Sequence, residues 1–179
     1  MAQQQQTDSR PSDLGTRLIS AAALIPPVMA AAYFGEPYFD TLVLIGGAIL
    51  LYELYRASGG RIAWTLAGGS YVAVAIVSLL SLRQLTDHGA MTIYWLFVLV
   101  WSADTLAYFV GRSLGGPKLA LKISPNKTWS GFVGAILGAA IAGSGVAFYL
   151  LKTNIWSLIL VSAALGAVSQ IGDLLESWF

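Results

Sequence analysis

Apolar residues dominate the chain in six long runs, over residues 18–35, 39–55, 63–82, 91–111, 129–151 and 155–174. Each run approaches the roughly 20 residues that an α-helix needs to cross a bilayer. Short polar connections separate the runs, and Pro26 and Pro27 interrupt the first. Residues 1–17 are polar, so we expect a disordered tail there and one transmembrane domain over 18–179. The pattern predicts an all-α, polytopic membrane protein with about six transmembrane helices.

The composition excludes a soluble domain. The 179 residues are 56% hydrophobic and only 11% charged, and the mean hydropathy is +0.69. A soluble domain of this size would need more polar surface, so we expect an integral membrane protein. The absence of Cys excludes disulfides and thiolate metal sites. A net charge of +1 gives no indication of nucleic-acid binding, and we expect no such partner.

The basic residues predict the orientation in the membrane. If six helices alternate in direction, two basic residues, Arg83 and Lys152, fall on one side. The other eight of the ten share the opposite side: Arg10, Arg17, Arg56, Arg61, Arg112, Lys118, Lys122 and Lys127. Cytoplasmic loops carry the excess of Lys and Arg in membrane proteins. Both termini and the connection between the fourth and fifth runs are therefore predicted to be cytoplasmic.

The fourth apolar run contains an acid, Asp104. Trp101, Asp104, Tyr108 and Arg112 follow one another at i, i+3, i+7 and i+11, which places them on one face of a helix. Asp104 precedes Arg112 by about 12 Å of helix, which puts it in the cytoplasmic half of the bilayer. An ionised acid in hydrocarbon costs several kcal/mol, so we expect it to face a polar cavity. Asp104 would then belong to a cation or substrate site. The alternative is that it forms a structural ion pair or is a protonated acid that only packs.

The connection that follows suggests an anion site. Gly115 and Gly116 would allow a close approach of the backbone to a ligand, and Lys118 and Lys122 follow them. Ser124 is a candidate N-cap and Pro125 a candidate first residue of the fifth helix. Free N–H groups and the dipole at such a helix start, together with Lys127, would bind an anion. The alternative is that these lysines only mark the cytoplasmic side.

The last apolar run ends with further polar residues. Gln170, Asp173 and Glu176 share a helix face at the end expected to lie on the same side as Asp104. Mg²⁺ prefers carboxylates, waters and substrate phosphates, so Asp104, Asp173 and Glu176 are candidate metal ligands. Ordinary polarity at a helix end is the alternative explanation.

The fifth run is rich in glycine and contains Gly134 and Gly138 as a GxxxG pair. Small residues at this spacing allow membrane helices to approach closely. The pair predicts either close packing within the chain or the seam of a homodimer.

Together these residues resemble the phosphatidate cytidylyltransferase family, also called CDP-diacylglycerol synthases. The match starts with Arg17 before the first helix and Glu53 in the second. It continues through Asp104-x3-Tyr108-x2-Gly111-Arg112, Ser124-Pro125-x-Lys127-Thr128-Trp129-x-Gly131 and Ser169-Gln170-x-Gly172-Asp173-x2-Glu176-Ser177. The Ser-Pro-x-Lys-Thr block is the most specific of these motifs. Ser130 stands where the family often has Glu, a departure that removes one polar contact.

The resemblance implies transfer of a cytidylyl group from CTP to phosphatidate with Mg²⁺, releasing pyrophosphate, in the inner membrane of a bacterium with the site facing the cytoplasm. It implies catalytic roles for Asp104, Lys127, Asp173 and Glu176. It implies substrate-binding roles for other positions of the motifs and the connection: Tyr108, Arg112, Lys118, Lys122, Ser124, Pro125, Thr128 and Gln170.

The family signature continues after the Glu-Ser pair with a Lys-Asp pair and an Asp-Arg-x-Asp, and this chain stops at Phe179. We therefore expect a C-terminally truncated domain with little transferase activity of its own. A CTP-dependent kinase of a lipid alcohol is an alternative that would use the same acid and lysines. A small channel or transporter would use Asp104 in an ion path, although no inverted repeat is evident. A non-catalytic membrane protein with the same fold is the third alternative.

Overall fold

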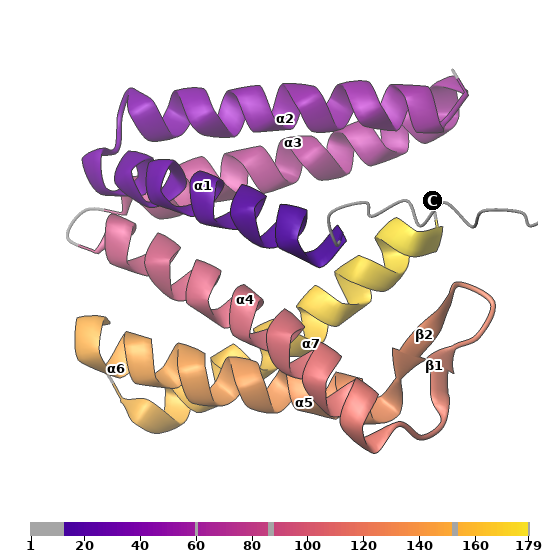
Figure 1. Cartoon of the computed structure of the whole chain (residues 1–179). Coiled ribbons are helices and arrows are strands. Elements are labelled where there is room, and N and C mark those ends of the chain that lie inside the picture. Colours follow the sequence, from indigo (N-terminus) through magenta and orange to yellow (C-terminus); the bar gives the residue numbers. More distant parts are fainter. Residues whose placement is uncertain (1–12, 60, 86–87, 152–153, 179) are drawn as a thin grey trace, which may run out of the picture.

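The computed structural model describes residues 13–59, 61–85, 88–151 and 154–178, and these residues are mostly helical (Figure 1). The elements, in chain order, are α1 (Asp13–Phe34), α2 (Tyr38–Ala57), α3 (Ile62–Gln84), α4 (Gly89–Leu114), β1 (Lys118–Ala120), β2 (Ser124–Thr128), α5 (Trp129–Gly138), a π-helical stretch η1 (Ala139–Gly143), α6 (Ser144–Leu151) and α7 (Ile155–Trp178). The prediction of an all-α polytopic membrane protein is confirmed, with two short strands added.

Within the described residues, five helical segments are long and apolar enough to cross a membrane: α2, α3, α4, the continuous segment Trp129–Tyr149 of α5, η1 and α6, and α7. The first predicted span is not among these five segments. Its helix α1 begins at Asp13, within the stretch expected to be a polar tail. Pro26 and Pro27 lie inside α1 and do not end it. The stretch Ala22–Phe34 of α1 is a shorter apolar helix than the other five.

The helices form two groups, α1 to α3 and α4 to α7, which meet where α1 and α3 pack on α4 (Figure 1). Successive helices run in opposite directions. As a result, the α2–α3 turn, the β-hairpin and the end of α7 all lie at one end of the molecule. Ring contact between Trp64 of α3 and Trp178 of α7, with centroids 5.9 Å apart, joins two of these elements. The basic residues Arg56, Arg61 and Lys127 therefore share one end.

The opposite end is held by a clamp between α1 and α3. Arg83 Nε donates to the carbonyl oxygen of Ala32 at 2.6 Å, and its Nη2 donates to that of Tyr33 at 3.0 Å. These carbonyls belong to the last turn of α1, where helix carbonyls lack intrahelical partners. Beside this clamp, Ala32 of α1, Phe39 of α2 and Ile93 of α4 form one buried apolar cluster. The clamp holds α1 on α3, and the cluster joins α1 and α2 to α4.

The α4–α5 contact depends on glycine. A Cβ atom added to Gly134 would lie 2.9 Å from the carbonyl oxygen of Leu106, and one added to Gly138 would lie 2.7 Å from that of Ser102. The two backbones are therefore too close for any larger residue at these positions. The GxxxG pair therefore serves close packing within the chain, the first of the two uses expected for it.

The prediction that Ser124 and Pro125 begin the fifth helix was wrong. Both residues lie in β2, which pairs antiparallel with β1 through Lys118 with Thr128 and Ala120 with Ser124. The helix begins four residues later, at Trp129, and Thr128 is its N-cap. The Thr128 hydroxyl accepts a hydrogen bond from the Gly131 N–H at 3.1 Å. Pairing with β1 keeps this stretch extended, which a local N-cap pattern cannot reveal.

Candidate functional site

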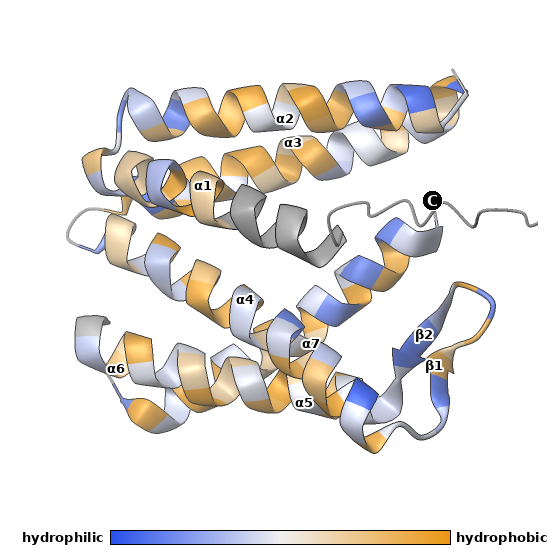
Figure 2. Cartoon of the chain, in the orientation of Figure 1, coloured by the Kyte–Doolittle hydropathy of each residue, from blue (hydrophilic) through white to orange (hydrophobic). Residues whose placement is uncertain are grey.

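A cavity of about 780 Å³ opens between α4, the β-hairpin, α5 and α7. Its walls combine polar and charged side chains with glycine backbone. The lining residues are Asp104, Ala107, Tyr108, Gly111, Arg112, Gly115, Gly116, Lys118, Leu119, Asn126, Lys127, Thr128, Gly131, Phe132, Gln170 and Asp173. The cavity lies at the end of the molecule that carries the basic connections, where the hydrophilic colouring of the hairpin and of α7 is concentrated (Figure 2).

Close packing of α4 and α5 brings the walls together. A Cβ on Gly131 would lie 2.9 Å from the carbonyl oxygen of Ala107 and 3.4 Å from the Cα of Gly111. Gly131 is in the first turn of α5, and Lys127 precedes that turn by two residues. The missing side chains at Gly111 and Gly131 therefore allow Lys127 to reach the face of α4 that carries Asp104.

Asp104 is tied to α7. Its Oδ1 accepts a hydrogen bond from Gln170 Nε2 at 3.3 Å, which links two helices that are 66 residues apart in sequence. Gln170 is buried, at 4% exposure, whereas Asp104 is exposed to the cavity. Gln170 thus fixes the carboxylate from the protein side, and no hydrogen bond from the described residues occupies its other oxygen.

The second carboxylate is paired with a lysine. Lys127 Nζ lies 3.0 Å from Asp173 Oδ2, and the two side chains are 22% and 45% exposed. Asp173 stands three residues after Gln170 on α7, so the two share a helix face. The pair joins the hairpin to α7 and places a positive and a negative group side by side at the cavity wall.

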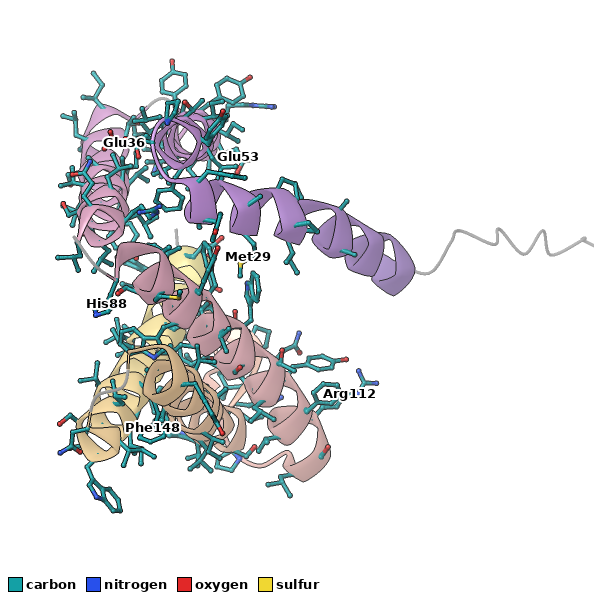
Figure 3. The ribbon with its side chains drawn as sticks, turned by 90° about the vertical axis from the view of Figure 1, so that its left-hand side faces the viewer. Met29, Glu36, Glu53, His88, Arg112 and Phe148 are labelled. Carbon is teal, nitrogen blue, oxygen red and sulfur yellow. The ribbon has the colours of Figure 1, made fainter. Side chains whose placement is uncertain are left out.

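Further cations stand near the mouth of the cavity. Arg112 Nη1 donates to the Tyr108 hydroxyl at 2.8 Å, one helical turn earlier. Figure 3 shows Arg112 projecting outward from the far end of α4. Lys118 lines the cavity from β1. After α4, Gly115 and Gly116 have φ values of 60° and 103°, which favour glycine and turn the chain back towards the cavity.

Ser130 closes this turn. Its hydroxyl donates to the Gly115 carbonyl oxygen and lies 3.0 Å from the Thr128 hydroxyl. Sequence reasoning treated Ser130 as a minor departure from a family pattern, yet here it connects the end of α4 to the start of α5.

A second, apolar groove of about 520 Å³ meets Asp104 from the other side. Leu24, Ile25 and Val28 of α1 form one wall, and Trp101, Asp104 and Thr105 of α4 form the other. Figure 3 shows α1 and α4 diverging from their contact, which leaves this side of the helix bundle open. Asp104 therefore stands where a polar cavity and an apolar groove adjoin.

The arrangement suits a phosphate-bearing ligand more than an ordinary apolar one. Three cations (Arg112, Lys118 and Lys127) and two carboxylates line one cavity. Cations attract phosphate oxygens, and one or two carboxylates with waters and phosphates are the usual partners of Mg²⁺. In the part of the chain that the structure describes, no three His, Asp or Glu side chains gather into a metal-binding group.

Comparison with known proteins identifies the family. Residues 19–179 match the model of the Cytidylyltransferase family. The chain belongs to the cytidylyltransferase family. It is 44% identical over 136 residues to the phosphatidate cytidylyltransferase of Brucella abortus strain 2308, a match that covers 76% of this chain and 49% of that relative.

More distant cytidylyltransferases align over more of the chain. The phosphatidate cytidylyltransferase of Rickettsia bellii is 32% identical over 180 residues, covering 96% of this chain and 77% of the relative. That of Staphylococcus haemolyticus is 33% identical over 169 residues, covering 90% and 64%. The chain spans about half the length of the Brucella relatives that it matches. No solved structure matches it.

The structure brings most of the predicted site residues of this cytidylyltransferase-family chain together. The residues that line the cavity as expected are Asp104, Tyr108, Arg112, Lys118, Lys127, Thr128, Gln170 and Asp173. Ser124 and Pro125 lie in β2 outside the lining, and Lys122 is at the tip of the hairpin. Glu176 is exposed near the end of α7 and does not reach the cavity.

Sequence reasoning missed two contributors. Asn126 lines the cavity from β2, and its position between Pro125 and Lys127 in the most specific motif was the available signal. Gly111 was named only as part of a motif, although its contact with Gly131 sets the distance between α4 and α5. Glu53, from the same resemblance, lies in the α1–α3 group, away from Arg112 (Figure 3).

Proposed function

We propose that this chain carries the site for cytidylyl transfer from CTP to phosphatidate. The observation that carries the proposal is the meeting of two unlike spaces at Asp104, a cationic polar cavity and an apolar groove. A water-soluble nucleotide and a membrane lipid need such a junction in order to react. The names of the aligned relatives support the same reaction.

The reaction makes modest demands on the protein. An oxygen of the phosphatidate phosphate attacks the α-phosphorus of CTP, and the bond from that phosphorus to the oxygen bridging to the β-phosphate breaks, releasing pyrophosphate. The nucleophile is already ionised at neutral pH, so no side chain has to remove a proton from it. The site must hold two anionic groups together and in line, which requires charge neutralisation and alignment.

Lys118, Lys127 and Arg112 supply positive charge for the CTP phosphates in this proposal. Lys127 is already paired with Asp173 at 3.0 Å, so its ammonium group is held at the cavity wall before substrate arrives. Asn126, with an amide that both donates and accepts, is placed to contact the nucleotide in the same cavity.

Mg²⁺ would be held by Asp104 and Asp173. Two carboxylates in one cavity fit a cation that completes its shell with waters and substrate phosphates. When bound, Mg²⁺ neutralises negative charge on phosphate oxygens. Gln170 orients the Asp104 carboxylate for this role. Glu176 would not be a ligand because it lies outside the cavity.

The apolar groove would admit the lipid. Leu24, Ile25 and Val28 offer aliphatic surface to an acyl chain, and the groove leads to Asp104. A lipid that enters sideways from the bilayer keeps its tails in an apolar setting while its phosphate reaches the polar cavity.

We also propose that the cavity faces the cytoplasm, in the inner membrane of a bacterium, with both termini on that side. The clustering of the basic connections at the cavity end supports this orientation. Because the chain has no Cys, single cysteines can report it. A cysteine at Ser58 should react with an impermeant maleimide only after the cells are opened, and one at His88 should react in intact cells. The reverse pattern would contradict the orientation.

Differently labelled CTP tests the reaction. Purified protein in mixed micelles with phosphatidate and Mg²⁺ receives CTP labelled either in the base or in the γ-phosphate. Cytidylyl transfer puts the base label into lipid and releases the γ label as pyrophosphate. Saturable binding of base-labelled CTP is measured alongside.

A γ label that appears in an added lipid alcohol would establish a kinase and contradict the proposal. Absence of both Mg²⁺-dependent CTP binding and base-labelled lipid would also contradict it.

A further inference from the structure

The tip of the β-hairpin has a surface of its own, distinct from the cavity. The turn between β1 and β2 consists of Leu121, Lys122 and Ile123, closed by a hydrogen bond from the Ile123 N–H to the Ala120 carbonyl oxygen at 3.1 Å. Leu121 is 69% exposed and Ile123 is 37% exposed. None of these three residues lines the cavity. The turn thus presents two aliphatic side chains on either side of an exposed lysine.

The charge around this tip is one-sided. The sequence contains no Asp or Glu from Thr105 to Gly172. Among the described residues, Lys127 pairs with Asp173, and no carboxylate pairs with Lys122. A cation between two exposed aliphatic side chains is complementary to a surface whose outer layer is anionic and whose inner layer is apolar.

The position of the hairpin supplies such a surface. α4 ends at Leu114 and α5 begins at Trp129, and both belong to membrane-spanning segments. Trp129 is 51% exposed at this boundary, a position that aromatic residues favour at a membrane interface. Strands of three and five residues reach about 10 to 17 Å at about 3.3 Å per residue, so the tip stays near the bilayer surface.

The base of the hairpin is firmly connected to the helices. The Trp129 N–H donates to the Pro117 carbonyl oxygen at 3.1 Å, and Lys118 pairs in register with Thr128. Figures 1 and 2 show the hairpin turned away from the axis of α5, with both apolar and hydrophilic colouring at its tip. The tip therefore cannot swing freely into the solvent, and its aliphatic side chains have the headgroup layer within reach.

We propose that the hairpin tip docks on an anionic leaflet, with Leu121 and Ile123 entering the headgroup layer and Lys122 pairing with lipid phosphates. Amphipathic elements with basic residues bind anionic membranes in this way. Lys118, on the same hairpin, lines the cavity, so docking also holds one cavity wall at the membrane. This inference rests on the membrane embedding of the chain and not on the proposed cytidylyl transfer.

A single fluorophore tests the docking. The chain lacks Cys, so Leu121→Cys can carry one environment-sensitive label on the full 179-residue protein. The labelled protein is placed in lipid nanodiscs of phosphatidylcholine alone or with phosphatidylglycerol. We measure the emission maximum, quenching by neutral acrylamide from the water, and quenching by a spin label on the lipid headgroup.

Adding phosphatidylglycerol should shift the emission to the blue, reduce acrylamide quenching and increase headgroup quenching. Lys122→Gln in the same labelled protein should remove most of this lipid dependence while leaving the thermal unfolding temperature unchanged. A label at Ala57→Cys, exposed at the end of α2 and outside the hairpin, should not respond to Lys122→Gln.

Three results would overturn the inference. The Leu121 label could stay fully accessible to acrylamide in both lipids. It could be shielded equally in both lipids, with no effect of Lys122→Gln. Or it could become shielded only when CTP is added, which would assign the tip to the nucleotide site instead of the membrane.

Discussion

Glycine plays different parts in the two helix groups, and the difference shows where the chain builds its site. In the first group, a Cβ on Gly47 or Gly68 would meet only the tips of the Ile76 or Leu54 side chains. In the second group, a Cβ on Gly131, Gly134 or Gly138 would meet carbonyl oxygens of α4. A side-chain tip can rotate away, whereas a helix backbone cannot.

Burial follows the same division. Only 11% and 6% of the most apolar 18-residue stretches of α2 and α3 are buried within the chain, compared with 44% for that of Trp129–Tyr149. The first group therefore offers most of its apolar surface to lipid. The second group packs backbone against backbone, and that rigidity holds Asp104, Lys127 and Asp173 around one cavity.

The largest expected effect comes from the acid of the second group. In a version of the chain extended with the family's C-terminal signature, Asp104→Asn should lower base-label incorporation into lipid by about 10²-fold or more, because it removes a charge that a metal or the aligned phosphates require. The side-chain volume hardly changes, so the unfolding temperature should stay close to that of the wild type. Glu36→Gln, at the opposite end of the molecule, is the control and should leave incorporation unchanged. Equal effects of the two variants would show that Asp104 does not belong to the site.

The next effect separates binding from stability. Lys127→Gln should weaken CTP binding by about ten- to a hundredfold, because a hydrogen bond to a charged group contributes about 1.5–3 kcal/mol. The Lys127–Asp173 pair is partly exposed, so its loss should change the free energy of unfolding by no more than about 1 kcal/mol. Arg61→Gln, in the first group, should leave CTP affinity unchanged. Titration with labelled CTP and thermal unfolding measure the two quantities, and a large loss of stability with intact binding would contradict this assignment.

A methyl group tests the packing directly. Gly134→Ala should destabilise the protein by about 1–3 kcal/mol, because the new Cβ would lie 2.8 Å from Val110 Cβ and 2.9 Å from the Leu106 carbonyl oxygen. Gly145→Ala is a matched control in the same span, because nothing lies within 4 Å of its added Cβ. Unfolding in detergent by intrinsic fluorescence compares them. A similar unfolding temperature for both variants would mean that α4 and α5 are less closely packed than described.

The smallest effect is expected in the first group. Gly47→Ala meets only the movable end of Ile76, and replacing a helical glycine by alanine gains about 0.5–1 kcal/mol of backbone entropy. The unfolding temperature should therefore change little or rise slightly. A loss as large as that of Gly134→Ala would abolish the distinction between the two groups.

Hydrophobic patterning predicted the spans because each helix satisfies its own backbone and needs only a long apolar run. It also predicted that Gly134 and Gly138 would lie at a close contact. It could not show which helix packs against these glycines, because a helix of another copy and α4 of the same chain impose the same requirement for small residues. The structure shows that both glycines pack against α4 of the same chain.

The site was predictable as far as the spacing of residues along one helix determines a face. Asp104 and Tyr108 lie on the cavity side of α4 as expected. The start of α5 was not predictable, because pairing of β2 with residues of β1 decides it and Ser124-Pro125 imitates a helix start. The sequence also could not show which residues near the end of α7 reach the cavity. Spacing places Glu176 on the same helix face as Asp173 but does not show whether it lines the cavity.

Photo-crosslinking with an azido analogue of CTP tests the central claim most directly, because it reports where the nucleotide binds. The purified chain is irradiated with the analogue and Mg²⁺, and the modified peptides are identified by mass spectrometry, with excess CTP as competitor. The account predicts competed labelling on the cavity walls, within residues 111–119, 126–132 or 170–173. Competed labelling on α2 or α3 instead would contradict it, and so would labelling that CTP does not reduce.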